Sequence, residues 1–221
     1  MKGTFHLNGN NINGSSHLSP HEIKTALAAH EISCHTAALP AALTAKITES
    51  KQTLERICGY PIRGISLSHH EADHTLAAHL CKLGICYART TRSTEEFSLP
   101  EDFMHWHPTC HHDSPHLFQL LENFKASKIN LALFDLRGNC LELENDNSRE
   151  VIERFCAAAA EDPDIWYATN IEICDYVTAL RALCFSVDRT MVYNPTATDV
   201  WISADGRPIR IAAGATLHLN T

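Results

Sequence analysis

The sequence predicts an α/β fold in which short strands alternate with helices and form a parallel sheet. Helix-start signals recur along the chain: a capping box at Ser19 with Pro20 in the first turn, a capping aspartate at Asp73, and a further capping box at Thr169. Short segments rich in Ile, Leu and Val lie between these helices. Because a helix follows each strand, we expect neighbouring strands to run parallel.

In the first half of the chain, strand and helix signals follow one another closely. Gly59 and Gly84 each come after a helical pattern, where helices commonly end. The expected strands are residues 2–7, 31–35, 62–67 and 85–89, and the expected helices are residues 20–30, 40–58 and 73–83.

In the second half, residues 90–113 form a long segment without clear periodicity, of the kind that is usually functional in a compact domain. A helix is expected from Ser114, followed by an apolar strand at residues 129–136 and a helix capped by Asn147. A strand at 165–168 and a helix from Thr169 come next. The tail has strand and turn signals, so we divide the chain into a main domain, 1–186, and an antiparallel β appendage, 187–221.

Composition limits the function classes. The 221 residues carry a net charge of −8, with Lys and Arg scattered, which argues against a nucleic-acid or anionic membrane partner. The sequence lacks the run of about 20 apolar residues that a membrane helix needs, and Met1 leads directly into a strand-like segment. We therefore expect a cytoplasmic protein. The nine cysteines include no CxxC pair and are interpreted as reduced.

Several phrases of the chain form a specific combination. They are residues 3–9 (GTFHLNG), His35-Thr36, 59–64 (GYPIRG), 87–93 (YARTTRS), 97–100 (FSLP) and 106–112 (WHPTCHH). Together they resemble the polysaccharide deacetylase, or NodB-homology, family, and in particular an intracellular subgroup of it. The resemblance implies an irregular (β/α) barrel, here lacking its first β/α unit, with the small antiparallel appendage at the C-terminus.

The same resemblance implies a divalent metal that activates water for attack on an N-acetyl group. Its ligands and base are an early Asp pair and two histidines spaced H-[ST]-x-x-H, and a late His donates a proton. Here the Asp pair would precede Gly3, so the N-terminus is expected to be truncated. His35 remains, but Leu39 stands at the second histidine position and Asn139 at the proton donor. The site is therefore expected to be degenerate, with His35 as a residual ligand and no cofactor.

A rearranged metal site is the alternative. His69, His70 and His74 form an HHxxxH group, a spacing used for zinc, although Asp73 is more simply a helix cap and His74 a solvated residue. A second histidine group lies in the long segment, where the resemblance places it beside the substrate cleft, and it can equally be a polar loop packed over Trp106. The candidate ligand-binding residues are Arg89, Arg92, Trp106, His107, His111 and His112.

Two function hypotheses follow. The first is a degenerate deacetylase-like protein that retains at most carbohydrate binding or an interaction role. The second is an active metal-dependent deacetylase of an N-acetylated sugar, which would use His35 with recruited histidines and zinc or another divalent metal. A homo-oligomer that covers the open seam of the barrel is also expected. His6 and His30 are interpreted as surface or core histidines, without a functional role.

Overall fold

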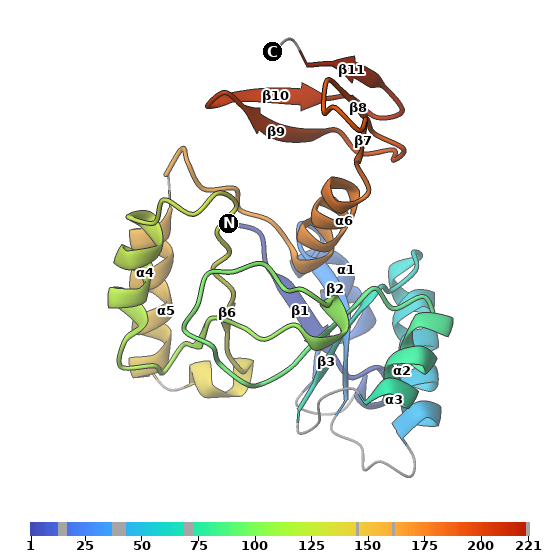
Figure 1. The fold of residues 1–221 in the computed structure, drawn as a ribbon. Helices are drawn as coiled ribbons and strands as arrows, with labels where there is room; N and C mark the ends of the chain where they lie inside the picture. The colour runs from blue at the N-terminus through green and yellow to red at the C-terminus, as the bar shows by residue number, and fades with distance from the viewer. Residues whose placement is uncertain (13–16, 37–42, 69–72, 145, 161, 220–221) are drawn as a thin grey trace. The chain divides into compact units, whose positions relative to one another are not determined.

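The computed structural model describes residues 1–12, 17–36, 43–68, 73–144, 146–160 and 162–219 (Figure 1). By internal contacts the chain forms two compact units, Met1–Thr169 and Asn170–Thr221. The boundary expected between residues 186 and 187 falls inside the second unit, and the division into those two domains stays a prediction. Each unit is described separately.

The first unit is built on a four-stranded parallel sheet with the strand order β1-β2-β3-β4 (Figure 1). Its strands are β1 (Thr4–Leu7), β2 (Glu31–Thr36), β3 (Gly64–Leu67) and β4 (Tyr87–Arg89). The connecting helices are α1 (Pro20–Ala26), α2 (Leu43–Cys58) and α3 (His74–Lys82), with the 3-10 turn η1 (Gly9–Asn11) after β1. The predicted alternation of strand and helix and the parallel sheet are confirmed.

The local signals for the helix ends act as predicted. The Ser19 hydroxyl accepts a hydrogen bond from the Glu22 backbone N–H (3.3 Å), and the Glu22 carboxylate accepts one from the Ser19 backbone N–H (2.8 Å). The Asp73 carboxylate caps α3 by accepting from the Leu76 N–H (2.8 Å). Gly59 and Gly84 follow α2 and α3 with φ of 79° and 76°, a conformation that glycine adopts without a steric penalty.

The two faces of this sheet differ in character because side chains alternate along each strand. One face is apolar and packs against the helices; its buried members include Ile32, Cys34, Ile65, Leu67 and Ala88. The register of the parallel pairs aligns polar residues on the other face, and these are Thr4, His6, Glu31, Ser33, His35, Ser66, Tyr87 and Arg89. A polar layer therefore lies across the face of the sheet opposite the helices.

At the amino-terminal end of this polar layer, Glu31 is buried and accepts two hydrogen bonds. The Thr4 hydroxyl donates to it at 2.9 Å and the Tyr87 hydroxyl at 2.7 Å. Burial and the neighbouring Glu31 raise the pKa of Tyr87 well above its usual value. Gly64 lies opposite Tyr87 in the register, and a Cβ atom at Gly64 would lie only 2.1 Å from the tyrosine ring. Glycine at this position makes room for the aromatic ring.

The rest of the first unit contains a second, two-stranded parallel sheet of β5 (Cys110–His111) and β6 (Leu136–Arg137). Helices α4 (Leu117–Lys125) and α5 (Asp146–Ala159) lie side by side (Figure 1). Phe134 packs against the buried cluster formed by their apolar side chains. The 3-10 turns η3 (Phe103–His105) and η4 (Cys140–Glu144) complete it. An isolated parallel bridge between Arg89 and Trp106 extends the pairing beyond β4. A closed barrel stays a prediction, as does the oligomer expected at its seam.

Two predicted strands are wrong. The apolar run 129–136 forms a strand only at its end, because Leu131 has a φ of 58°, which interrupts an extended chain, and because Ile129 and Leu131 are exposed. Residues 165–168 form no strand. Apolar composition alone favoured both strands, but a strand also needs a neighbour with which to pair.

The second unit contains α6 (Asn170–Arg181) and five antiparallel strands around Ala179, Val192, Val200 and Ile211. These strands are β7 (Cys184–Phe185), β8 (Met191–Tyr193), β9 (Val200–Ala204), β10 (Arg207–Ile211) and β11 (Thr216–His218). Asp205 and Gly206 join β9 to β10 with φ of 51° and 74°, as in a tight hairpin turn. The predicted C-terminal antiparallel strands are confirmed.

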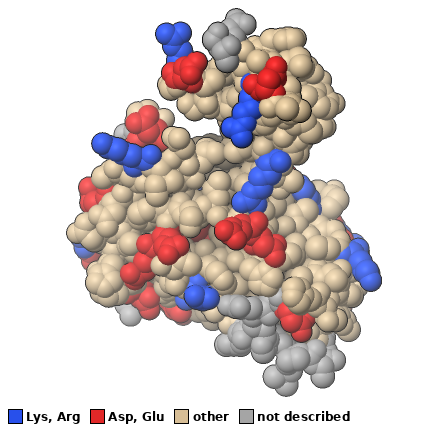
Figure 2. Space-filling model, in the orientation of Figure 1, with Lys and Arg blue, Asp and Glu red and all other residues tan. Residues whose placement is uncertain are grey.

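On the face drawn in Figure 2, Lys and Arg lie singly or in small groups, with Asp and Glu between them. Within the part of the chain that the structure describes, none of the helices has the length and apolar character that crossing a membrane requires. The expected absence of a nucleic-acid partner stays a prediction.

Candidate functional site

The candidate site lies on the polar face of the sheet, toward the carboxyl ends of its strands. His6 on β1 is in register with Ser33 on β2, and His35 on β2 is in register with Ser66 on β3. Ser66 is in turn aligned with Arg89 at the end of β4. Ligands of parallel α/β folds bind outside the carboxyl ends of the strands, so this row of side chains is placed where function is expected.

His35 is held between two serine hydroxyls. Its Nδ1 lies 2.8 Å from Ser66 Oγ, and its Nε2 lies 3.0 Å from Ser68 Oγ. Because both ring nitrogens are in hydrogen bonds, a metal ion at this ring would have to displace one serine. Within the described residues, His35 belongs to no group of three or more His, Cys, Asp or Glu side chains that could hold a metal ion. In the part of the chain that the structure describes, the surroundings of His35 therefore do not fit the metal that the family resemblance implies.

The other residues of the expected metal sites are only partly described. Leu39, His69 and His70 lie outside the described residues. His74 is exposed at the first position of α3, directly after the capping Asp73, which is consistent with a solvated residue. The side-chain oxygen of Asn139 accepts a hydrogen bond from the Leu141 backbone N–H (3.1 Å), so Asn139 stabilises the start of the turn η4.

His6 takes part in the site although sequence reasoning gave it no role. Its Nδ1 lies 2.9 Å from Ser33 Oγ, and its Nε2 accepts a hydrogen bond from Arg89 Nε at 3.3 Å. Burial, followed by the electrostatic effects of Arg89 and then His35, holds the pKa of His6 well below its ordinary value. His6 is therefore neutral at pH 7, with the proton on Nδ1 and a lone pair facing Arg89.

This depressed pKa predicts a pH-dependent stability. At acidic pH the folded protein binds fewer protons at His6 than the unfolded protein does. The contribution of neutral His6 to the free energy of unfolding is therefore fully present above the pKa of an unfolded histidine, about 6.5, and is lost as the pH falls below that value. The loss is at most about 1.4 kcal/mol per pH unit. We expect the free energy of unfolding, measured by urea titration at about pH 7.5 and about pH 5.5, to fall less in His6→Gln than in the wild type.

Asp135 does not confound this comparison. Burial raises the pKa of Asp135, so protonation of this carboxyl group increases the free energy of unfolding as the pH falls, opposite to the effect of His6. Asp135 is present in both proteins, so its effect is the same in each. An identical pH dependence in His6→Gln and wild type would contradict the assignment of His6 as a buried neutral imidazole.

Asp135, just before β6, and Arg137, on β6, are close enough to Arg89 for the charges of the three side chains to interact. Asp135 is held by the loop before β5: its carbonyl accepts from the Thr109 N–H (2.9 Å), and its N–H donates to the Thr109 hydroxyl (3.1 Å). The charges of Arg89 and Arg137 oppose the effect of burial on the pKa of Asp135. Arg89 Nη1, Asp135 Oδ2 and Arg137 Nε are all buried without a hydrogen-bond partner within the described residues. We call His6, His35, Arg89, Asp135 and Arg137 the strand-end cluster.

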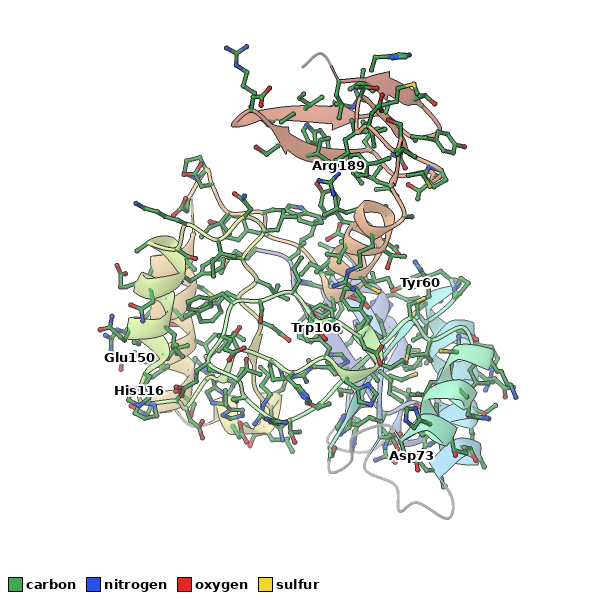
Figure 3. All side chains as sticks on the ribbon, in the orientation of Figure 1. Tyr60, Asp73, Trp106, His116, Glu150 and Arg189 are labelled. Atoms are coloured by element: carbon green, nitrogen blue, oxygen red, sulfur yellow. The ribbon has the colours of Figure 1, made fainter. Side chains whose placement is uncertain are left out.

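The remaining predicted ligand-binding residues are placed differently. Arg92 is exposed beyond the end of β4. Trp106 is fully buried, with its ring 5.5 Å from that of Tyr87 and 5.4 Å from that of Phe103 between centroids (Figure 3). His107 Nδ1 lies 2.6 Å from the Thr90 hydroxyl. A ligand-binding role for these three residues stays a prediction.

His111 and His112 lie together at the end of β5, with ring centroids 4.4 Å apart. His111 Nδ1 is 2.6 Å from an Asp113 carboxylate oxygen, and His111 Nε2 is 3.3 Å from Glu142 Oε2. His112 Nδ1 is 3.6 Å from the same Glu142 oxygen. Burial and the neighbouring His111 lower the pKa of His112. The structure thus adds two carboxylates to a histidine pair that the sequence had identified.

Sequence reasoning missed Asp135, Arg137 and Glu142. The alternation of apolar and charged residues in Phe134-Asp135-Leu136-Arg137 is the signal for the first two, because residues two apart in a strand point to the same side. The strand was instead interpreted as buried on both faces.

Comparisons with known proteins give structural likeness only. No family model matches the sequence, and no curated protein matches it. A polysaccharide deacetylase from Bacillus cereus has 20% sequence identity and a TM-score of 0.38, covering 47% of this chain and 35% of its own. A deacetylase from Streptococcus pyogenes, solved with acetate, has 15% identity and a TM-score of 0.41, covering 48% and 51%. A proposed polysaccharide deacetylase from Mycobacterium smegmatis has 17% identity and a TM-score of 0.48, covering 80% and 72%.

The chain therefore resembles solved polysaccharide deacetylases in structure at low sequence identity. It spans 35% of the length of the Bacillus cereus protein. The intracellular subgroup and the degenerate site stay predictions.

Proposed function

We propose that this protein is a catalytically degenerate, polysaccharide deacetylase-like protein that binds carbohydrate at the strand-end cluster. The observation that carries the proposal is a set of three buried polar atoms that have no hydrogen-bond partner among the described residues: Arg89 Nη1 and Arg137 Nε, which donate, and Asp135 Oδ2, which accepts when ionised. Each buried polar group left without a hydrogen bond costs about 1–3 kcal/mol, so a ligand that satisfies all three gains binding energy.

The mixture of donors and an acceptor favours a hydroxyl-rich ligand over a simple anion. A sugar hydroxyl can accept from a guanidinium group and donate to a carboxylate at the same time. An anion such as phosphate would satisfy Arg89 and Arg137 but would be repelled by an ionised Asp135. The neutral His6 and the serines around His35 add uncharged hydrogen-bonding groups to the same face.

Loss of hydrolysis is supported by what surrounds the family's functional positions. His35 is hydrogen-bonded to Ser66 and Ser68. Asn139, which stands at the position of the proton donor, caps a turn and does not titrate near neutral pH. The sequence also places Leu39, which has no lone pair for a cation, at the second histidine position.

Binding of N-acetylglucosamine oligomers, measured by titration calorimetry, tests the proposal. Because hydrogen bonds to charged groups contribute about 1.5–3 kcal/mol, we expect Arg89→Ala to weaken binding about 10- to 100-fold. Arg92→Ala is the matched control, since Arg92 is an exposed arginine close in sequence, and we expect it to bind as the wild type does.

Asp135→Asn provides a second variant in case Arg89→Ala fails to fold. This nearly isosteric change removes a charge and keeps an acceptor, and we expect it to alter oligosaccharide affinity without loss of folded structure in circular dichroism. Failure of the wild type to bind any neutral oligosaccharide, or equal affinity in Arg89→Ala and wild type, would overturn the proposal.

The second candidate function is an active metal-dependent deacetylase with a rearranged, His-rich site. The specific observation in its favour is the convergence of His111, His112 and Glu142 in the same unit as His35. This second function predicts that the protein releases acetate from N-acetylated sugars, and that the release requires both the metal and His35. The degenerate protein proposed first releases none.

A further inference from the structure

Three side chains meet beyond the carboxyl ends of β5 and β6. These strands are parallel, and His111 is in register with Arg137, so the segments that follow them leave from the same edge of the small sheet. The His112 N–H donates to the Arg137 carbonyl (2.9 Å), which fixes the chain just after β5. Glu142 lies in the turn η4 after β6, and its carboxylate accepts from the Asn139 N–H (3.3 Å).

The distances among the three side chains match a tetrahedral metal site. With metal–ligand bonds of about 2.0–2.2 Å, two ligand atoms of a tetrahedron lie about 3.3–3.6 Å apart. Glu142 Oε2 lies 3.3 Å from His111 Nε2 and 3.6 Å from His112 Nδ1. All three ligand atoms lie within 4.8 Å of one another. One cation can therefore reach all three with small side-chain adjustments.

The orientation of His111 also suits a metal ligand. Its Nδ1 lies 2.6 Å from the Asp113 carboxylate, which accepts the Nδ1 proton. In the neutral ring this leaves a lone pair on Nε2, directed toward Glu142. Metal-binding histidines commonly donate their second N–H to a carboxylate in this way, which fixes the ring and raises its basicity.

His112 supplies an independent indication of a ligand. Its side chain is only 3% exposed, and its Nδ1 is buried without a hydrogen-bond partner within the described residues. The 3.6 Å to Glu142 is too long for a hydrogen bond. Gly138 allows the ring to lie here, since a Cβ atom at this position would be 2.6 Å from His112 Nδ1. His112 also lines a pocket of about 290 Å³ between the starts of α4 and α5.

We propose that His111 Nε2, His112 Nδ1 and Glu142 form a binding site for a divalent transition-metal ion of the zinc type. Two imidazoles and one carboxylate favour zinc over magnesium or calcium, which prefer oxygen ligands. A fourth coordination position remains for water or a ligand from the pocket. Asp113 is a positioning residue. The site is separate from His35, and the proposal goes beyond carbohydrate binding at the strand-end cluster.

Metal binding by the full chain, produced without a histidine tag and stripped with a chelator, tests the site. We expect the wild type to bind one zinc ion per chain in equilibrium dialysis with elemental analysis, and bound Co²⁺ to show tetrahedral ligand-field absorption. Glu142→Gln and His111→Gln should each weaken zinc binding by more than about tenfold, and Asp113→Asn by about 10- to 100-fold. Glu144→Gln, an exposed glutamate in the same turn, is the matched control and should bind zinc normally.

His35→Ala distinguishes this site from a metal at the strand ends. We expect it to retain zinc. Loss of zinc in His35→Ala, with full binding in Glu142→Gln and His111→Gln, would overturn the proposal and place the metal at His35 instead. Absence of zinc binding by the wild type would also overturn it. Neither result bears on oligosaccharide binding, which Arg89→Ala tests separately.

Discussion

Replacing Trp106 with alanine is expected to lower the free energy of unfolding by about 3–5 kcal/mol, as is typical of large-to-small changes in a core. Trp106 is fully buried, and its ring packs edge-on against Tyr87 and Phe103. The Trp106 backbone also bridges to β4, donating to the Ala88 carbonyl (3.1 Å). Loss of the Trp106 indole ring leaves a cavity that the rigid neighbouring side chains fill poorly. Urea titration followed by far-UV circular dichroism measures the effect.

Trp201→Ala is the control, because Trp201 is a tryptophan that is 48% exposed. A markedly smaller loss is expected for it, since less of its surface leaves water on folding. The comparison also separates the two interpretations of Trp106 made from the sequence. A stable Trp106→Ala protein with weakened oligosaccharide binding would favour ligand binding, whereas a large loss of stability favours packing.

Gly64→Ala is expected to destabilise the protein by about 1–3 kcal/mol, the usual cost of overpacking a core. The added methyl group would lie 2.1 Å from a Tyr87 ring carbon and 2.2 Å from the Tyr87 hydroxyl oxygen. Tyr87 cannot move freely, because it packs against Trp106 and donates to the buried Glu31. Any shift of the ring therefore also weakens a buried hydrogen bond.

Gly3→Ala is the matched control in the same titration. A Cβ atom at Gly3 has its nearest neighbour, His30 Nδ1, at 3.7 Å, which is ordinary van der Waals contact. We expect Gly3→Ala to change the free energy of unfolding by less than about 0.5 kcal/mol. Equal effects of the two substitutions would show that the packing around Tyr87 is looser than described.

The sequence predicted the parts of the fold that depend on local chemistry. The capping box at Ser19, the cap at Asp73 and the terminating glycines Gly59 and Gly84 each use hydrogen bonds or backbone conformations within a few residues. The turn at Asp205-Gly206 belongs to the same class. Such signals act wherever the segment lies in the fold.

Features that depend on distant partners could not be predicted in this way. An apolar run at residues 129–136 suggested a strand, but the left-handed backbone of Leu131 ends any extended segment there. His6 resembles any surface histidine in the sequence, and only its register with Ser33 and its contact with Arg89 identify its role. Glu142 joins His111 only because β5 and β6 pair, across about thirty residues of chain.

In the proposed function, the strand-end cluster binds carbohydrate without hydrolysing it. Acetate release from N-acetylglucosamine oligomers is measured with excess zinc on the samples used for calorimetry. The account predicts oligosaccharide binding that weakens in Arg89→Ala and no acetate above the level of a protein-free control. Zinc-dependent acetate release that disappears in His35→Ala would contradict it.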